Sequence, residues 1–100
     1  MDVLTRIKRC ALRGNLRFMV KAQLELEIDD LTREDVRESL VNAAAIYKTI
    51  RSPVPGIGRE YLHIIESASF QGVVIYSKGK LVVEDDREVY YVLISSKQAL

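Results

Sequence analysis

The sequence predicts an α+β domain in which three N-terminal helices pack on one face of a mostly antiparallel sheet of about four strands. Apolar residues recur at helical spacing as far as Asn42, and β-branched or alternating runs follow from Ala45 onward. With 100 residues, 48% of them hydrophobic and 29% charged, the chain has the size and composition of one folded domain covering residues 1–100.

The first helix is predicted from an apolar face formed by Val3, Leu4, Ile7 and Ala11. Asp2 is a suitable N-cap for this helix, and Gly14 is a suitable stop. A second helix is predicted from Val20, Leu24 and Ile28, which recur at four-residue spacing.

The third helix has the clearest start signal in the chain. Thr32 and Asp35 fit a capping box with Asp in place of Glu, and Leu31 can pack on Val36 as a hydrophobic staple. The helix is therefore predicted to begin at Arg33. Its buried stripe is predicted to consist of Val36, Leu40 and Ala43 or Ala44.

Strands are predicted over residues 45–51, 60–66, 72–78 (with a continuation through 81–83) and 88–97. The segment 52–58 is rich in Pro and Gly and separates the first two strands. A turn or bulge is expected at residues 78–80, and residues 84–87 turn the chain into the last strand.

Composition excludes several classes of function. Cys10 and His63 are the only residues of their kinds, so a structural zinc site is not expected, and no carboxylate cluster has calcium-loop spacing. The sequence also lacks a P-loop, a dinucleotide fingerprint, a nucleophile elbow and an HExxH motif. No apolar run approaches the ~20 residues of a membrane helix, and the N-terminus lacks the apolar core of a signal peptide. We therefore expect a cytoplasmic protein without metal or cofactor.

The charges are segregated, although the net charge is only +1. The net charge is +5 over residues 1–22, −5 over residues 23–44, +3 over residues 45–83 and −2 over the remainder. On the first helix, Arg6, Arg9 and Arg13 fall on one side, opposite the apolar face. Such a stripe can track phosphates, dock an acidic partner or simply form a solvated face, and the pattern does not choose among these interpretations.

Lys48 interrupts the apolar face of the first predicted strand. Alternation places it on the same face as Ile46 and Ile50, although lysine is among the residues least often buried. Two explanations follow. Either the strand lies at a sheet edge and the charge protects it, or the lysine is held there for chemistry.

Other cations and phenols lie on the predicted sheet. Tyr76 and Lys78 share a face of the third strand, Tyr91 and Lys97 share a face of the last, and Arg59 begins the second. Such groups suit the cleavage of a phosphodiester, because cations stabilise charge on the phosphate and a phenol or amine moves protons. RNA supplies its own nucleophile, the 2′-OH. The alternative is that these are ordinary solvated strand residues.

The order of the elements and four segments resemble MqsR-like small bacterial proteins of the RelE/ParE toxin superfamily and a sister family of similar length. The segments are RFMVKAQLELEIDDLTREDVRESLVNA, IYKTIRS, GVVIYSKGK and YYVLISSK, so the resemblance covers nearly the whole chain. It implies a metal-free endoribonuclease that cuts messenger RNA. It also implies a type II toxin–antitoxin pair, in which an antitoxin with a helix-turn-helix part silences the toxin.

The resemblance also implies site residues. Lys48 in IYKT matches the family's strand-borne lysine, and Lys97 in ISSK matches the lysine that closes its last strand. Tyr76 in VVIYSK best matches the tyrosine of a middle strand, whereas a slip of one residue would select Ile75. Arg59 corresponds to a glutamine of the family, which keeps a hydrogen-bond donor and changes its charge. The predicted catalytic residues are Lys48, Arg59, Tyr76 and Lys97, and the predicted RNA-binding residues are Arg6, Arg9, Arg13, Lys78 and Lys80.

Two hypotheses follow, and neither involves a membrane or a small-molecule cofactor. The first is a metal-independent endoribonuclease that binds RNA and an antitoxin. The second is a non-catalytic module of the same fold that docks a protein partner through the acidic second and third helices or the basic first. The first hypothesis requires Lys48, Tyr76 and Lys97 on one concave face, whereas the second does not.

Overall fold

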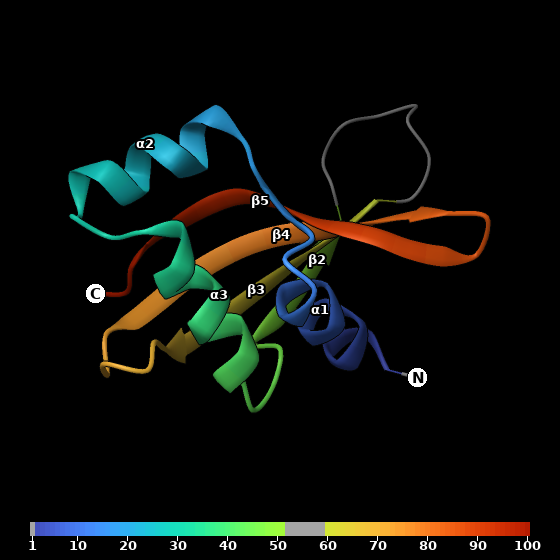
Figure 1. Cartoon of the computed structure of the whole chain (residues 1–100), viewed down its shortest axis with the longest axis horizontal. Coiled ribbons are helices and arrows are strands. Elements are labelled where there is room, and N and C mark those ends of the chain that lie inside the picture. The colour runs from blue at the N-terminus through green and yellow to red at the C-terminus, as the bar shows by residue number, and fades with distance from the viewer. Residues whose placement is uncertain (1, 52–59) are drawn as a thin grey trace.

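The computed structural model describes residues 2–51 and 60–100, which form a layer of helices on a sheet (Figure 1). Helices α1 (Val3–Leu12) and α3 (Arg33–Asn42) lie over one face of the strands, and α2 (Val20–Ile28) lies at one margin. The predicted α+β class, with three N-terminal helices on a mostly antiparallel sheet, is confirmed. Within the described ranges, each helix is too short or too polar to cross a membrane.

The two ends of α1 follow from local sequence signals. Asp2 Oδ1 accepts a 2.8 Å hydrogen bond from the backbone N–H of Thr5, as an N-cap does. Gly14 has a left-handed backbone with φ of 73°, and its N–H donates to the carbonyl of Ala11 at 3.2 Å. Both predicted ends of this helix are therefore confirmed.

The start of α3 is also as predicted. The Thr32 hydroxyl accepts from the backbone N–H of Asp35 at 3.1 Å, and the Asp35 carboxylate accepts from the backbone N–H of Thr32 at 2.8 Å. This capping box makes Arg33 the first helical residue. The buried stripe contains Val36, Leu40 and Ala43, whereas Ala44 is exposed.

Helix α2 has the predicted position, but the residues that predicted it face outward. Val20, Leu24 and Ile28 are 76%, 52% and 82% exposed, whereas Ala22 and Leu26 are fully buried. Residues two positions apart lie on nearly opposite sides of a helix. The apolar spacing predicts the helix correctly but not its orientation, because α2 is apolar on both sides.

The sheet contains five strands within the described residues, in the order β1-β5-β4-β3-β2. Their bounds are Leu16–Phe18 (β1), Lys48–Arg51 (β2), Tyr61–Ala68 (β3), Val74–Glu84 (β4) and Arg87–Gln98 (β5). Strands β2 to β5 pair antiparallel in chain order. The first predicted strand begins at Lys48 rather than Ala45, and it is an edge of the sheet.

The sequence did not predict the fifth strand, β1. It pairs parallel with β5, from Leu16 opposite Tyr91 to Phe18 opposite Leu93. Three residues are too few for alternation to be recognised. Their extended conformation depends on a partner strand far along the chain.

A register shift in β5 corrects one predicted pair. Between Lys78 and Gly79 the pairing of β4 with β5 shifts by one, and Ile94 is the extra residue. Tyr91 and Lys97 therefore do not share a face, because a bulge between them reverses the alternation. Tyr91 is fully buried in the core, whereas Lys97 is exposed.

The hydrophobic core lies between the helices and the sheet. Every helix contributes to it, and so do β3, β4 and β5. Its largest fully buried apolar side chains are Tyr91, Ile7, Leu26, Leu40, Ile65, Ile75 and Leu93. The opposite face of the sheet is left open by the three described helices, and we call it the helix-free face.

Candidate functional site

A row of three polar side chains crosses the sheet where β3, β4 and β5 lie side by side. Tyr76 pairs with Glu66 on one side and with Lys97 on the other. Directly paired residues point to the same side of a sheet. Ile75 and Ser77, the neighbours of Tyr76 on β4, are fully buried on the side of the helices. The row Glu66–Tyr76–Lys97 therefore lies on the helix-free face.

A second row lies two residues further along the same face. Lys48 on β2 pairs with Ile64 on β3, which pairs with Lys78 on β4. Because residues two apart on a strand share a face, Lys48 and Lys78 lie on the same side of the sheet as Tyr76. The register thus brings Lys48, Lys78 and Lys97 to the same surface as Tyr76.

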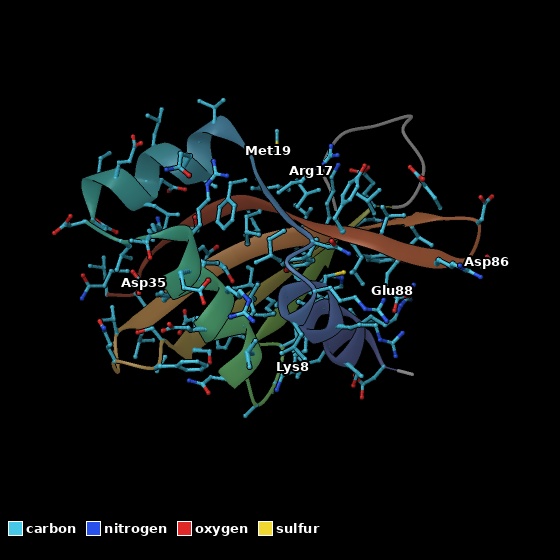
Figure 2. All side chains as sticks on the ribbon, in the orientation of Figure 1. Lys8, Arg17, Met19, Asp35, Asp86 and Glu88 are labelled. Atoms are coloured by element: carbon cyan, nitrogen blue, oxygen red, sulfur yellow. The ribbon has the colours of Figure 1, made fainter. Side chains whose placement is uncertain are left out.

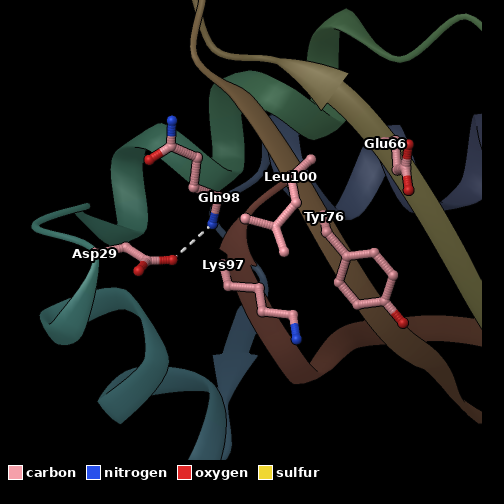
Figure 3. A pocket seen from close by; sticks show the side chains of 7 residues that line it. Asp29, Glu66, Tyr76, Lys97, Gln98 and Leu100 are labelled. Atoms are coloured by element: carbon pink, nitrogen blue, oxygen red, sulfur yellow. Dashed lines mark hydrogen bonds between the residues drawn. The ribbon is translucent and has the colours of Figure 1, made fainter.

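Tyr76 and Lys97 border a pocket of about 560 Å³ (Figure 3). The ammonium nitrogen of Lys97 lies 5.5 Å from the centre of the Tyr76 ring, within the range of a cation–π contact. Figure 3 shows both side chains extending in the same direction from neighbouring strands, with Glu66 on the strand beyond Tyr76. The other residues that line the pocket are Asp29, Glu66, Gln98, Ala99 and Leu100. An ammonium, a phenol and two carboxylates therefore border one cavity.

Helix α2 supplies one wall of this pocket through its C-cap, Asp29. The Asp29 carboxylate accepts a 2.8 Å hydrogen bond from the backbone N–H of Gln98 (Figure 3). One turn before Asp29, the Glu25 carboxylate accepts hydrogen bonds from the Ser95 hydroxyl at 2.8 Å and from the backbone N–H of Ser96 at 3.3 Å. These contacts fix α2 on β5 and hold the pocket wall in place.

Lys48 lies apart from the pocket. Strand β3 separates it from Tyr76, and with ordinary strand spacings the two Cα atoms are roughly 12 Å apart. The Lys48 side chain is exposed on the edge strand. The position of Lys48 on an edge strand fits the explanation that its charge protects that edge. Its location on the same face as Tyr76 fits the explanation that it takes part in the chemistry.

The remaining predicted residues of the sheet differ in their surroundings. Lys78 is half-buried in the row of Lys48. The Lys80 ammonium donates to the Glu60 carboxylate at 3.2 Å, so an ion pair holds this predicted RNA-binding residue. Arg59 lies outside the described residues.

Two arginines of the α1 stripe contact Glu88 of β5, which Figure 2 shows beside α1. Glu88 accepts a 2.7 Å hydrogen bond from Arg9 Nη1 and lies 3.5 Å from Arg6 Nε. The pKa of Glu88 is lowered, first by a hydrogen bond from its own backbone N–H and then by the charges of Arg9 and Arg6. Arg13, the C-cap of α1, is exposed. The chain itself therefore partly neutralises the predicted RNA-binding stripe.

The sequence reasoning did not single out Glu66 or Asp29. The strand partner of Glu66 could have been predicted, because the turn between β3 and β4 is short. The turn is closed by a 2.8 Å hydrogen bond from the Ser69 N–H to the Val73 carbonyl. Counting outward from such a hairpin pairs Tyr76 with Glu66. Asp29 had no comparable signal, because its position depends on where α2 docks.

His63 is a buried strand residue rather than a free catalytic base. It lies on β3 with 7% of its surface exposed, and its Nδ1 is 3.1 Å from the Thr49 hydroxyl. Burial lowers the pKa of its imidazole. Across residues 2–51 and 60–100, no three His, Cys, Asp or Glu side chains gather in a group that could hold a metal ion.

Comparison with known proteins gives no match: no family model, curated protein or solved structure matches the chain. The site is therefore interpreted from its own geometry and chemistry.

Proposed function

We propose that the chain is a metal-independent endoribonuclease that cleaves messenger RNA through the RNA's own 2′-hydroxyl. The main support is the row Glu66–Tyr76–Lys97, which places a carboxylate, a phenol and an ammonium beside one cavity on the helix-free face. These groups can supply the charge stabilisation and the two proton transfers that such a cleavage needs. The cellular role that we propose, the toxin of a type II pair with a helix-turn-helix antitoxin, rests on the resemblance to MqsR-like proteins.

The proposed reaction divides the work among the three residues of the row. The 2′-oxygen attacks the adjacent phosphorus, a 2′,3′-cyclic phosphate forms, and the bond to the 5′-oxygen breaks. Glu66 accepts the proton of the 2′-hydroxyl, and Tyr76 donates a proton to the leaving 5′-oxygen. Lys97 stabilises the extra negative charge on the phosphate in the transition state.

The second row provides binding rather than proton transfer. Lys78 and Lys48 lie on the same face as Tyr76. Lys78 is on β4, one strand spacing from β5, and Lys48 is on β2, two strand spacings from β4. Cations at such positions can neutralise phosphates on either side of the cleaved bond. In this proposal, Lys48 is an active-site cation that acts on substrate affinity.

The proposal is tested by incubating the purified protein with RNA in the presence of a chelator. We expect products that end in a 2′,3′-cyclic phosphate, and no cleavage where the attacking 2′-hydroxyl is replaced by hydrogen. Tyr76→Phe, Lys97→Ala and Glu66→Gln should each lower the cleavage rate by about a hundredfold, the scale of one acid–base or electrostatic group.

Two matched variants act as controls for these substitutions. Tyr61→Phe removes a phenol hydroxyl on the helix-bearing side of β3, and Lys21→Ala removes an exposed ammonium on α2. Both should retain the wild-type rate. No cleavage of free or ribosome-bound RNA by the wild type, or equal rates in all variants, would contradict the proposal.

The second candidate function is a non-catalytic binding module of the same fold. The outward apolar residues of α2 favour it, because exposed apolar patches on small domains often mark contact sites. Expression in a bacterial host separates the two candidates. A nuclease should arrest growth, the Lys97→Ala variant should not, and co-expression of the neighbouring gene should relieve the arrest.

A further inference from the structure

The N-terminal end of helix α2 lacks the side-chain cap that α1 and α3 possess. Its N-cap, Met19, makes no side-chain cap hydrogen bond. Within Val20–Ile28, the first turn has no acidic residue and the last turn has no basic residue. Lys21 instead lies at the N-terminal end, and Glu27 lies in the last turn before the C-cap Asp29. Each of these charges opposes the helix dipole.

The outer side of α2 carries a stripe of exposed apolar side chains that runs the length of the helix. Val20, Leu24 and Ile28, which we call the α2 stripe, recur every four residues and extend over about 12 Å. At its N-terminal end the stripe meets a hollow of about 440 Å³, lined by Phe18, Met19, Val20, Lys21 and Ile94. A surface helix normally presents polar residues to water, so an exposed apolar stripe of this kind is typical of a contact site for another molecule.

The surroundings of the α2 stripe are acidic. Residues 20–30 hold one lysine against four carboxylates, and the C-terminal end of a helix adds a negative potential of its own. Glu27 and Asp30 are exposed, and Asp29 is half-buried beside Gln98. The partner that fits this surface is therefore both apolar and positively charged.

We infer that the α2 stripe docks an amphipathic helix of another protein, with apolar anchors on the stripe and lysines or arginines facing Glu27, Asp29 and Asp30. Such a partner covers the exposed apolar residues and compensates the unfavourable charges at the end of α2. A second copy of the chain fits less well, because two α2 surfaces bring like charges together. An anionic membrane surface is disfavoured for the same reason.

This inference goes beyond the nuclease proposal, because it applies equally to an active enzyme and to a non-catalytic module. The docking surface nevertheless adjoins the pocket. Asp29 belongs both to the acidic end of α2 and to the pocket wall. Binding and RNA cleavage are measured separately, so failure of one leaves the other testable.

The experiment uses the full chain labelled for NMR and a synthetic helical peptide that has leucines at helical spacing and lysines beside them. We expect the amide signals of residues 19–30 to shift on titration. Affinity should fall by about tenfold or more in the double variant Leu24→Gln, Ile28→Gln, and by several-fold in Glu27→Gln. The same peptide with glutamates in place of the lysines should bind about tenfold more weakly.

Matched measurements make the result decisive. Val83→Gln, which changes an exposed apolar residue at the far end of β4, should leave peptide affinity unchanged. Leu24 and Ile28 are exposed, so their variants should keep the wild-type melting temperature. Equal binding of the two peptides, or shifts outside α2, would overturn the inference. Concentration-dependent shifts in α2 with sedimentation as a dimer would assign the surface to a second copy, and shifts with anionic vesicles would assign it to a membrane.

Discussion

Arg9 donates a 2.7 Å hydrogen bond to Glu88 and thereby joins the first helix to the last strand, 79 residues apart in sequence. Arg6 lies 3.5 Å from the same carboxylate. Glu88 is therefore the acidic partner of two of the arginines that we predict to bind RNA. Any phosphate that these arginines bind must compete with this carboxylate.

The first prediction concerns that competition. Glu88→Gln keeps the size of the side chain and removes its charge, so RNA should bind more tightly. The slope of log K against log salt should also become steeper by about one phosphate contact. Fluorescence anisotropy with a short RNA at several salt concentrations measures both effects. Glu84→Gln, an exposed carboxylate on the same hairpin, is the control, and an unchanged slope in Glu88→Gln would remove α1 from the RNA-binding surface.

The second prediction concerns acid stability. The folded-state pKa of Glu88 lies below its ordinary value of 4.5, so its ionised form stabilises the folded state. This contribution is present above the ordinary value and is lost as the pH falls through the lowered one. As the pH falls below about 5, the urea midpoint of the wild type should therefore fall more steeply than that of Glu88→Gln. Parallel curves for the two proteins would contradict the assignment.

The third prediction separates the two explanations of Lys48. As an active-site cation about 12 Å from Tyr76, it should act mainly on substrate binding. Lys48→Ala should raise KM by about tenfold, the effect of losing one charged contact of about 1.5 kcal/mol, and leave kcat nearly unchanged. If the lysine only protects the edge strand, Lys48→Ala should aggregate and keep its KM, and Lys48→Glu should stay soluble. Steady-state kinetics and light scattering on the two variants distinguish these outcomes.

The fourth prediction concerns Gly79, over which the ring of Tyr91 lies. A Cβ atom at this position would be 2.6 Å from two ring carbons and 2.7 Å from the Val92 carbonyl oxygen. Gly79→Ala should therefore lower the free energy of unfolding by about 1–3 kcal/mol through overpacking. Adding Tyr91→Leu should restore only part of the loss, because the backbone contact with Val92 remains. Chemical denaturation measures both variants, and wild-type stability of Gly79→Ala would show that the strands can separate at no cost.

The features that the sequence predicts correctly are those with local causes. The capping box at Thr32 and the glycine stop at Gly14 depend on a few neighbouring residues, so their chemistry is visible in the chain. The orientation of α2 is different, because both of its sides are apolar and only the docked structure shows that Ala22 and Leu26 are the buried ones.

The candidate site shows the same division between local and distant causes. The pairing of Tyr76 with Glu66 follows from a short hairpin, which could have been counted from the sequence. The pairing of Tyr76 with Lys97 depends on where the extra residue Ile94 lies in β5, because a bulge changes which side chains share a face. Lys97 reaches the helix-free face while Tyr91 enters the core for this reason.

Because β1 pairs with β5, the last strand of the chain, the sheet can finish folding only after β5 has been synthesised. A ribosome releases the N-terminal residues first, and domains form as their segments become available. Helix α1, β1 and α2 therefore emerge well before the strand to which β1 pairs and on which α2 docks. The row that contains Lys97 depends on the same strand, so the proposed active site cannot assemble on a nascent chain that still lacks β5. The proposed nuclease activity would therefore begin only after the chain has left the ribosome that makes it.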